Sequence, residues 1–204
     1  MNKRLVNYTR HLVARTVLHT TTINHTDPGL IANDDYQCGA YCGFDPTAKY
    51  LHLGNYLQIV TLARAAQFGI KPIYLMGGAT AMIGDPSGKQ STRAQLSIED
   101  VEKNSEQIKI DLESILANLF AYLRAREAAE IEEYSMMNNK GFYQNLNIID
   151  FLTHYGFHMN MASLLKREVV ARRIQNEQPL TYSEFSYQIF QAIDYLILKQ
   201  QMVG

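Results

Sequence analysis

Apolar residues in the first part of the chain form two short runs separated by a segment of helical spacing. The first run, Gln37–Phe44, predicts a strand, and the second, Pro72–Met76, is bounded by a proline and a glycine pair and predicts a buried strand. Between them, Leu53–Phe68 has apolar residues every three or four positions and ends at Gly69, as a glycine-capped helix does. Strand, helix and strand in this order form a βαβ unit, so we expect an α/β fold with a parallel sheet.

The remainder of the chain predicts mainly helices. Ser97–Ala121 begins with an acidic first turn and predicts a long helix. Ile131–Ser135 favours a short strand, and further helices are expected over Leu146–Tyr155, Leu164–Gln175 and Phe185–Lys199. We therefore expect helices to flank the sheet.

Composition narrows the class of protein without naming it. The chain has 204 residues, of which 47% are hydrophobic, which suits one compact core. Its 19 Lys and Arg residues are balanced by 20 Asp and Glu residues, so overall charge does not indicate a nucleic-acid partner. No apolar run reaches the roughly 18 residues of a membrane span, and no membrane association is expected. Cys38 and Cys42 lack a second pair of ligands, so we expect two reduced thiols and no protein-bound metal.

Residues 1–36 form a separate segment by composition. They are basic and carry no acidic residue before Asp27; the early basic residues are Lys3, Arg4, Arg10 and Arg15. This composition predicts an N-terminal extension that targets the protein to mitochondria. The alternative is an ordinary basic first helix on a soluble domain.

A first cluster of polar residues follows the first predicted strand, over residues 41–55. Its sequence is Tyr-Cys-Gly-Phe-Asp-Pro-Thr-Ala-Lys-Tyr-Leu-His-Leu-Gly-Asn. The cluster ends at a helix N-terminus, where free backbone N–H groups and the helix dipole favour anions. Thr47 and His52 are donors suited to phosphate oxygens, and Gly54 would let a ligand lie against the backbone. A capped helix with a surface histidine is the plainer alternative.

A second cluster follows the second predicted strand, over residues 77–89, with the sequence Gly-Gly-Ala-Thr-Ala-Met-Ile-Gly-Asp-Pro-Ser-Gly-Lys. Asp85 could hold an ammonium group, and Lys89 and Arg93 could contact phosphate. Gln90 after Lys89 breaks the spacing of a P-loop. By itself the segment could be an ordinary polar loop.

A third cluster lies on the last predicted helix. Tyr187, Gln191 and Asp194 fall at i, i+4 and i+7, so one helix face presents all three. The alternative is an amphipathic helix with a polar stripe.

The three clusters in this order resemble the tyrosyl-tRNA synthetase family of the bacterial and mitochondrial type. His52–Asn55 is similar to the His-Ile-Gly-His signature of class I synthetases in a His-Leu-Gly-Asn variant, which tryptophanyl enzymes also use. The second and third clusters favour the tyrosyl family. The resemblance covers residues 37–204 and implies the first half of a Rossmann-like catalytic domain with a parallel sheet, flanking helices and a helical insertion.

The resemblance implies a two-step reaction. Tyrosine and ATP, accompanied by Mg²⁺, give tyrosyl-adenylate and pyrophosphate, and the tyrosyl group then passes to tRNA(Tyr). It also implies a homodimer to which the segment around Tyr182 contributes. With the basic extension, the expected location is the mitochondrial matrix, or the cytoplasm if the source is bacterial.

For the amino acid, the resemblance assigns Tyr41 and Asp194 to the phenol of tyrosine. It assigns Asp85, Tyr187 and Gln191 to the ammonium group. A further residue near the amino acid is Asn139.

For the nucleotide, the resemblance implies that Thr47 and His52 stabilise the phosphates in the transition state. Lys89 and Arg93 would close over pyrophosphate. The remaining nucleotide-side residues are Cys42 and Asn55 at the ribose and Gly43, Asp45 and Gly54 along the nucleotide.

The chain also departs from the family pattern. Asn55 replaces a second histidine, Gln58 stands where a smaller threonine is common, and Pro179 lies in a slightly longer segment. After Gly204 the sequence lacks the family's later ribose-binding and lysine-loop motifs. We therefore expect an incomplete enzyme with weak tyrosine binding and no adenylate synthesis. The alternative is a non-catalytic, synthetase-like protein for RNA binding or assembly.

Overall fold

A computed structural model describes residues 3–18, 38–86, 96–126 and 131–203 of the chain. Residues 19–37 of the N-terminal part of the chain, and the positions of Lys89 and Arg93, lie outside the described residues.

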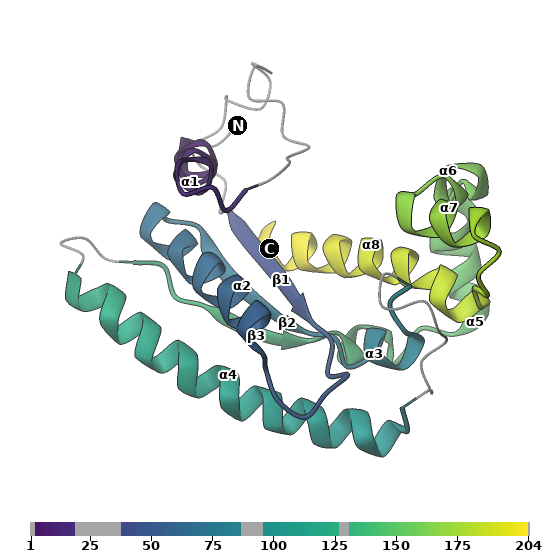
Figure 1. Cartoon of the computed structure of the whole chain (residues 1–204), viewed down its shortest axis with the longest axis horizontal. Helices are drawn as coiled ribbons and strands as arrows, with labels where there is room; N and C mark the ends of the chain where they lie inside the picture. Colours follow the sequence, from purple (N-terminus) through teal and green to yellow (C-terminus); the bar gives the residue numbers. More distant parts are fainter. Residues whose placement is uncertain (1–2, 19–37, 87–95, 127–130, 204) are drawn as a thin grey trace.

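The centre of the fold is a parallel sheet of three strands in the order β1-β2-β3 (Figure 1). The strands are β1 (Gly39–Phe44), β2 (Lys71–Met76) and β3 (Ser135–Asn138), and β2 pairs with both neighbours in parallel. The expected βαβ unit is confirmed. Its strands end together at one edge of the sheet, which places the residues that follow them side by side.

One face of the sheet is covered by α2 (Leu53–Ala63) and by the long helix α4 (Ile98–Arg126) (Figure 1). Helix α2 continues as a 3₁₀ turn, η2 (Arg64–Phe68), and ends at Gly69 with φ 67°, where a residue without Cβ avoids strain. The core on this face is built from Phe44, Ile59, Leu62, Ala63, Ala66, Tyr74, Leu112, Leu116, Phe120, Leu123 and Ile131. Both predicted helices are confirmed, and α4 extends one turn beyond its expected end.

The other face packs against the last helix, α8 (Tyr182–Val203) (Figure 1). Ile73 and Leu75 of β2 contact Leu198 of α8, whereas Tyr74 between them belongs to the opposite core. This alternation is the period of two expected of a strand buried on both faces. The helix is longer at both ends than its apolar pattern predicts.

The segment between β3 and α8 is a set of short helices: η3 (Asn139–Tyr143), α5 (Ile148–Asp150), the π turn η4 (Phe151–Tyr155), η5 (Gly156–His158), α6 (Met161–Leu165) and α7 (Glu168–Gln175). They share a second core with the first half of α8, made of Phe151, Leu164, Val170, Phe185, Ile189 and Ile193. The helix expected over Leu164–Gln175 is confirmed only from Glu168 onward, because Arg167 adopts an extended conformation with ψ 135° and separates α6 from α7.

The strand expected over 131–135 is also wrong in position. Ile131 is buried in the core beside α4, and the Glu132 backbone N–H donates to the Ala66 carbonyl in the middle of η2. Pairing with β2 begins only at Ser135, opposite Ile73. The apolar residues of this segment therefore mark packing before the strand and not the strand itself.

The N-terminal helix α1 (Lys3–Ala14) lies against η2. Tyr8 is 7% exposed, and its hydroxyl donates to the Thr61 carbonyl at 2.7 Å. A side-chain bond from Arg4 to the Gly69 carbonyl, at 2.9 Å, adds a second anchor. Within the described ranges, no helix is both long and apolar enough to cross a membrane.

Candidate active site

The three sequence clusters meet at the carboxyl edge of the sheet. The first follows β1, the second follows β2 and enters the short helix α3 (Thr80–Ile83), and the third lies on α8. Asn139 begins η3 directly after β3. In open α/β sheets this edge is where ligands bind.

Asp45, in the first cluster, is hydrogen-bonded to both of the others. Its Oδ1 accepts a hydrogen bond from the Thr80 hydroxyl at 2.6 Å, and its Oδ2 accepts one from the Tyr187 hydroxyl at 2.8 Å. Because Tyr187 uses its only hydroxyl proton on Asp45, its oxygen can act toward a ligand only as an acceptor. Asp45 therefore orients Tyr187 toward a cationic or donor group.

Asn139 joins the other end of the site to the same network. It is fully buried, and its Oδ1 accepts from the Ala79 backbone N–H at 2.8 Å, which fixes the orientation of the amide. Its Nδ2 then donates to Thr80 Oγ1 at 3.2 Å and to Asp194 Oδ2 at 2.9 Å. Asn139 is thus an internal bridge between Thr80 and Asp194.

Asp194 ends this chain of hydrogen bonds and is only 4% exposed. Its Oδ1 accepts from the Tyr143 hydroxyl at 2.5 Å, and that hydroxyl also lies 3.0 Å from the Phe190 carbonyl. Burial raises the pKa of Asp194; the hydrogen bonds from Tyr143 and Asn139 oppose this without cancelling it. Thr80 and Tyr143 are site residues that the sequence motifs did not single out, although Thr80 lies within the second cluster.

The ionisable groups of the site repel one another. Burial is the main cause that raises the pKa of Asp45, and the charges of Asp85 and Asp194 raise it further, whereas hydrogen bonds from Thr80 and Tyr187 lower it. A buried carboxylate, Asp194, near the partly buried Asp45 and Asp85 favours a cationic ligand, which would relieve the repulsion.

Tyr41 lies on the α8 side of β1, half-buried against the core that contains Leu198. Burial raises the pKa of its phenol, and the charge of Asp194 raises it further. Both residues belong to the described part of the chain, and no hydrogen bond joins them directly. Gln191, from the same predicted set, has an exposed side chain on α8.

His52 and Asn55 form a reciprocal cap at the start of α2. The Asn55 backbone N–H donates to His52 Nδ1 at 3.2 Å, and the His52 backbone N–H donates to Asn55 Oδ1 at 3.1 Å. Since Nδ1 is an acceptor, the neutral ring carries its proton on Nε2, which is left to donate outward. A Cβ on Gly54 would lie 3.0 Å from His52 Cε1, so glycine leaves room for the ring.

The other predicted nucleotide residues lie around this cap. Thr47 and Gly43 are exposed, and a Cβ on Gly43 would meet no atom within 4 Å. Cys42 packs at the edge of the core below α2, and burial raises the pKa of its thiol to about 11, so it stays protonated. In the described ranges, no group of three or more His, Cys, Asp or Glu residues is placed to hold a metal ion.

A cavity of about 630 Å³ opens nearby, between α4 and the loops after β2 and β3. Its wall includes Lys49, Gly78, Glu102 and Lys140, but none of the predicted substrate residues. We place the site on the network from Tyr187 to Asp194, because convergent buried polar groups indicate recognition better than open volume does.

Gly77 is required for the contact between the first two clusters. A Cβ at this position would lie 1.8 Å from Asp45 Oδ1 and 2.5 Å from Thr80 Oγ1. We expect Gly77→Ala to displace Asp45 and to lower the free energy of unfolding by about 1–3 kcal/mol. Gly141→Ala is the matched control, because its Cβ would meet nothing within 4 Å. Equal melting temperatures for the two variants would contradict this packing.

Comparisons with known proteins identify the family to which the chain belongs. The profile of the family described as "tRNA synthetases class I (W and Y)" matches residues 33–204. The chain is 41% identical over 160 residues to the tyrosine–tRNA ligase of Mycoplasmopsis pulmonis, and 40% identical over 164 residues to the mitochondrial tyrosine–tRNA ligase of Drosophila melanogaster. These matches cover 78% and 79% of this chain, which spans only 34% and 35% of those two relatives.

Solved structures show the same fold. A C-terminally truncated mitochondrial tyrosyl-tRNA synthetase from Aspergillus nidulans superposes with a TM-score of 0.84 at 24% identity, over 96% of this chain and 54% of that one. The corresponding Coccidioides posadasii protein gives a TM-score of 0.79 at 25% identity, over 97% of this chain and 53% of that one. Because the family profile matches residues 33–204, which are most of this chain, the chain belongs to the class I tRNA synthetases of the tryptophanyl and tyrosyl group.

Proposed function

We propose that this chain is the tyrosine-binding part of a tyrosyl-tRNA synthetase, which converts tyrosine and ATP into tyrosyl-adenylate and pyrophosphate and then charges tRNA(Tyr). The observation that carries the proposal is the hydrogen-bonded chain Tyr187–Asp45–Thr80–Asn139–Asp194. It presents an acceptor at one end and a buried carboxylate at the other, as the ammonium and phenol groups of tyrosine require.

At the ammonium end, Tyr187 offers oxygen lone pairs because its proton is held by Asp45. The carboxylate of Asp85 and the amide oxygen of Gln191 complete a set of acceptors for three N–H donors. At the phenol end, Tyr41 and Asp194 receive the substrate hydroxyl. Bound phenylalanine would leave the Asp194 carboxylate buried without a hydrogen-bond donor from the ligand, and this cost disfavours phenylalanine binding.

On the nucleotide side, we propose that ATP with Mg²⁺ lies at the N-terminus of α2. His52 Nε2 and Thr47 would stabilise charge that develops at the phosphates, and Lys89 and Arg93 would meet pyrophosphate. The nucleotide would lie along Cys42, Gly43, Gly54 and Asn55. Asp45 would support this end through the loop it fixes, since the hydroxyls of Thr80 and Tyr187 both donate to its carboxylate. Catalysis would rest on positioning and charge stabilisation, with no covalent intermediate on the protein.

We also propose a homodimer, supported by apolar side chains that the helical insertion and the start of α8 leave exposed. Examples are Ile148 at 66%, Phe157 at 83% and Tyr182 at 67%. These side chains all come from residues 148–182, and an exposed apolar patch is typical of protein–protein contacts.

A mitochondrial matrix location is supported by the Drosophila relative and by the two mitochondrial structures, although bacterial relatives match equally well. Residues 37–204 would form the catalytic part and residues 1–36 an extension, whose helix α1 packs against it.

A thermal-shift experiment tests the proposed function. The chain is heated alone, with L-tyrosine, with L-tryptophan and with unmodified tRNA transcript, since a ligand of the native state raises the melting temperature. We expect a rise with tyrosine alone. A rise with tryptophan would indicate the tryptophanyl branch of the family, and a rise with RNA alone would favour a non-catalytic RNA-binding protein.

A further inference from the structure

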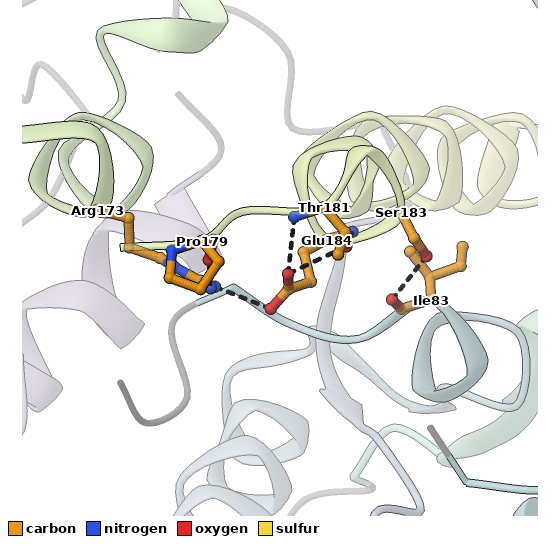
Figure 2. Close-up of polar contacts among 6 residues, drawn as sticks. All are labelled: Ile83, Arg173, Pro179, Thr181, Ser183 and Glu184. Atoms are coloured by element: carbon orange, nitrogen blue, oxygen red, sulfur yellow. Dashed lines mark hydrogen bonds and ion pairs between the residues drawn. The ribbon is translucent and has the colours of Figure 1, made fainter. Parts of the chain in front are cut away.

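A polar cluster joins the end of α7 to the start of α8, away from the proposed substrate contacts. Figure 2 shows the side chain of Glu184 pointing from the first turn of α8 toward Arg173. The guanidinium of Arg173, a residue only 5% exposed, donates from Nη1 to Glu184 Oε1 at 2.8 Å and from Nη2 to the Pro179 carbonyl. A buried arginine thus fixes the connection that enters α8.

The second oxygen of Glu184 closes the helix start. Glu184 Oε2 accepts from the Thr181 backbone N–H at 2.9 Å and from the Thr181 hydroxyl at 3.0 Å, and the Glu184 N–H donates back to Thr181 Oγ1 at 3.2 Å. This is a capping box. Burial alone would raise the pKa of Glu184, but the bonds from Thr181 and Arg173 hold it below its ordinary value, so the side chain is ionised at neutral pH.

The same helix turn is tied to the loop of the second cluster. The Ser183 hydroxyl donates to the Ile83 carbonyl at 2.8 Å, which Figure 2 also shows. Gly84 follows with φ 92°, and a Cβ there would lie 3.8 Å from Glu184 Cγ. Asp85 is the next residue, so the start of α8 and the proposed ammonium-binding loop are held together here.

The neighbouring pair Arg172–Glu168 shows what the buried pair adds. Its side chains are 66% and 81% exposed, whereas those of Arg173 and Glu184 are 6% and 15% exposed. Exposed ion pairs contribute little to the free energy of unfolding. A buried ion pair loses so much hydration on folding that a gain in stability alone does not explain its presence. Arg173 and Glu184 instead fix two elements of the site relative to each other.

We propose that Arg173 and Glu184 are positioning residues that set the spacing between Asp85 and Tyr187 and thereby the affinity for the ammonium group of tyrosine. This inference rests on the proposed function. Glu184 lies one helical turn before Tyr187, and Ser183 holds the residue two positions before Asp85. Asp194 lies near the middle of α8 and is fixed independently by Asn139 and Tyr143. The phenol end should therefore not depend on the pair.

The test compares two ligands and four variants of the chain. L-Tyrosine carries the ammonium group, and 3-(4-hydroxyphenyl)propionate lacks it; both dissociation constants are measured by ligand-observed NMR, which registers weak binding. For Arg173→Met and Glu184→Gln we expect tyrosine affinity to fall on the order of tenfold or more, because small displacements of binding groups are costly. Affinity for the propionate should stay within about twofold, as for a site whose phenol end is untouched.

Arg173→Lys should recover part of the tyrosine affinity, since lysine can still reach Glu184 but not Pro179 as well. Arg172→Met is the matched control and should leave the affinity for both ligands unchanged. Glu184→Gln keeps the shape of the side chain and its contacts with Thr181. This variant therefore tests the role of the pair even if Arg173→Met fails to fold.

An equal loss of affinity for both ligands in the variants would show a general structural role and overturn the inference. Unchanged affinity for both ligands would also overturn it. If the unaltered chain fails to bind tyrosine, the proposed function falls, and the inference falls with it.

Discussion

Replacing Asp194 by asparagine is expected to weaken tyrosine binding roughly 30- to 150-fold, since a hydrogen bond to a buried charged group contributes about 2–3 kcal/mol. The asparagine side chain has nearly the same shape as aspartate, but only its amide oxygen accepts hydrogen bonds, whereas its N–H₂ group donates them. Asn139 can donate to that oxygen, and the new amide N–H₂ can donate to Tyr143, whose hydroxyl then donates to the Phe190 carbonyl that lies 3.0 Å away. The substrate phenol loses its charged acceptor while the protein network stays complete.

The same substitution should not destabilise the fold. Burial raises the pKa of Asp194, so ionising this carboxyl group costs more free energy in the folded state than in the unfolded chain. The contribution of Asp194 to the free energy of unfolding is fully present below its ordinary pKa. It is lost as the pH rises through the pKa of the folded state, so at neutral pH the ionised group lowers the stability of the fold. We expect Asp194→Asn to melt at or above the temperature of the unaltered chain at pH 7. A large fall in melting temperature together with unchanged tyrosine affinity would show that Asp194 is structural.

Removing the imidazole of His52 is expected to slow tyrosyl-adenylate formation by about 10²–10³, the usual loss for a donor aimed at transition-state charge. The measurement is tyrosine-dependent exchange of pyrophosphate into ATP, carried out on the longest natural protein that contains this chain. His52→Ala also removes the cap of α2, which by itself costs about 1 kcal/mol of stability. The dissociation constant for tyrosine should hardly change, because tyrosine is held elsewhere.

His52→Asn separates these two roles. Asparagine is among the best N-cap residues, so its side chain can still accept from the Asn55 backbone N–H, but it is too short to donate outward as Nε2 does. We expect a normal melting temperature and a slow exchange rate. Full activity in His52→Asn would mean that the histidine serves only to cap the helix.

The sheet was predictable because its signals are local. The apolar runs that became β1 and β2 are bounded by glycine and proline, and Gly69 marks the end of the helix between them. The strand β3 was misplaced because Ile131 is apolar for another reason, its packing beside α4. The breaks within the insertion depend on the backbone conformation at Arg167, which periodicity does not reveal.

The site was predictable only in part. Tyr187, Gln191 and Asp194 share a helix face, so their spacing already indicated a site. Tertiary contacts created the rest: Tyr187 meets Asp45 from 142 positions away, and Tyr143 meets Asp194 from 51 positions away. No local pattern encodes such pairs, and for this reason the bridging role of Asn139 and the part played by Tyr143 emerged only from the fold.

If this chain carries a pocket for tyrosine, it should bind L-tyrosine more tightly than L-phenylalanine, and the two dissociation constants test this. L-Tyrosine and L-phenylalanine differ only in the phenol oxygen, which is expected to lie at Asp194 and Tyr41. Titration of the unaltered chain with each amino acid, followed by ligand-observed NMR, should give saturable binding of tyrosine and at least about tenfold weaker binding of phenylalanine. Equal affinities, or no binding of tyrosine at any concentration reached, would contradict the account.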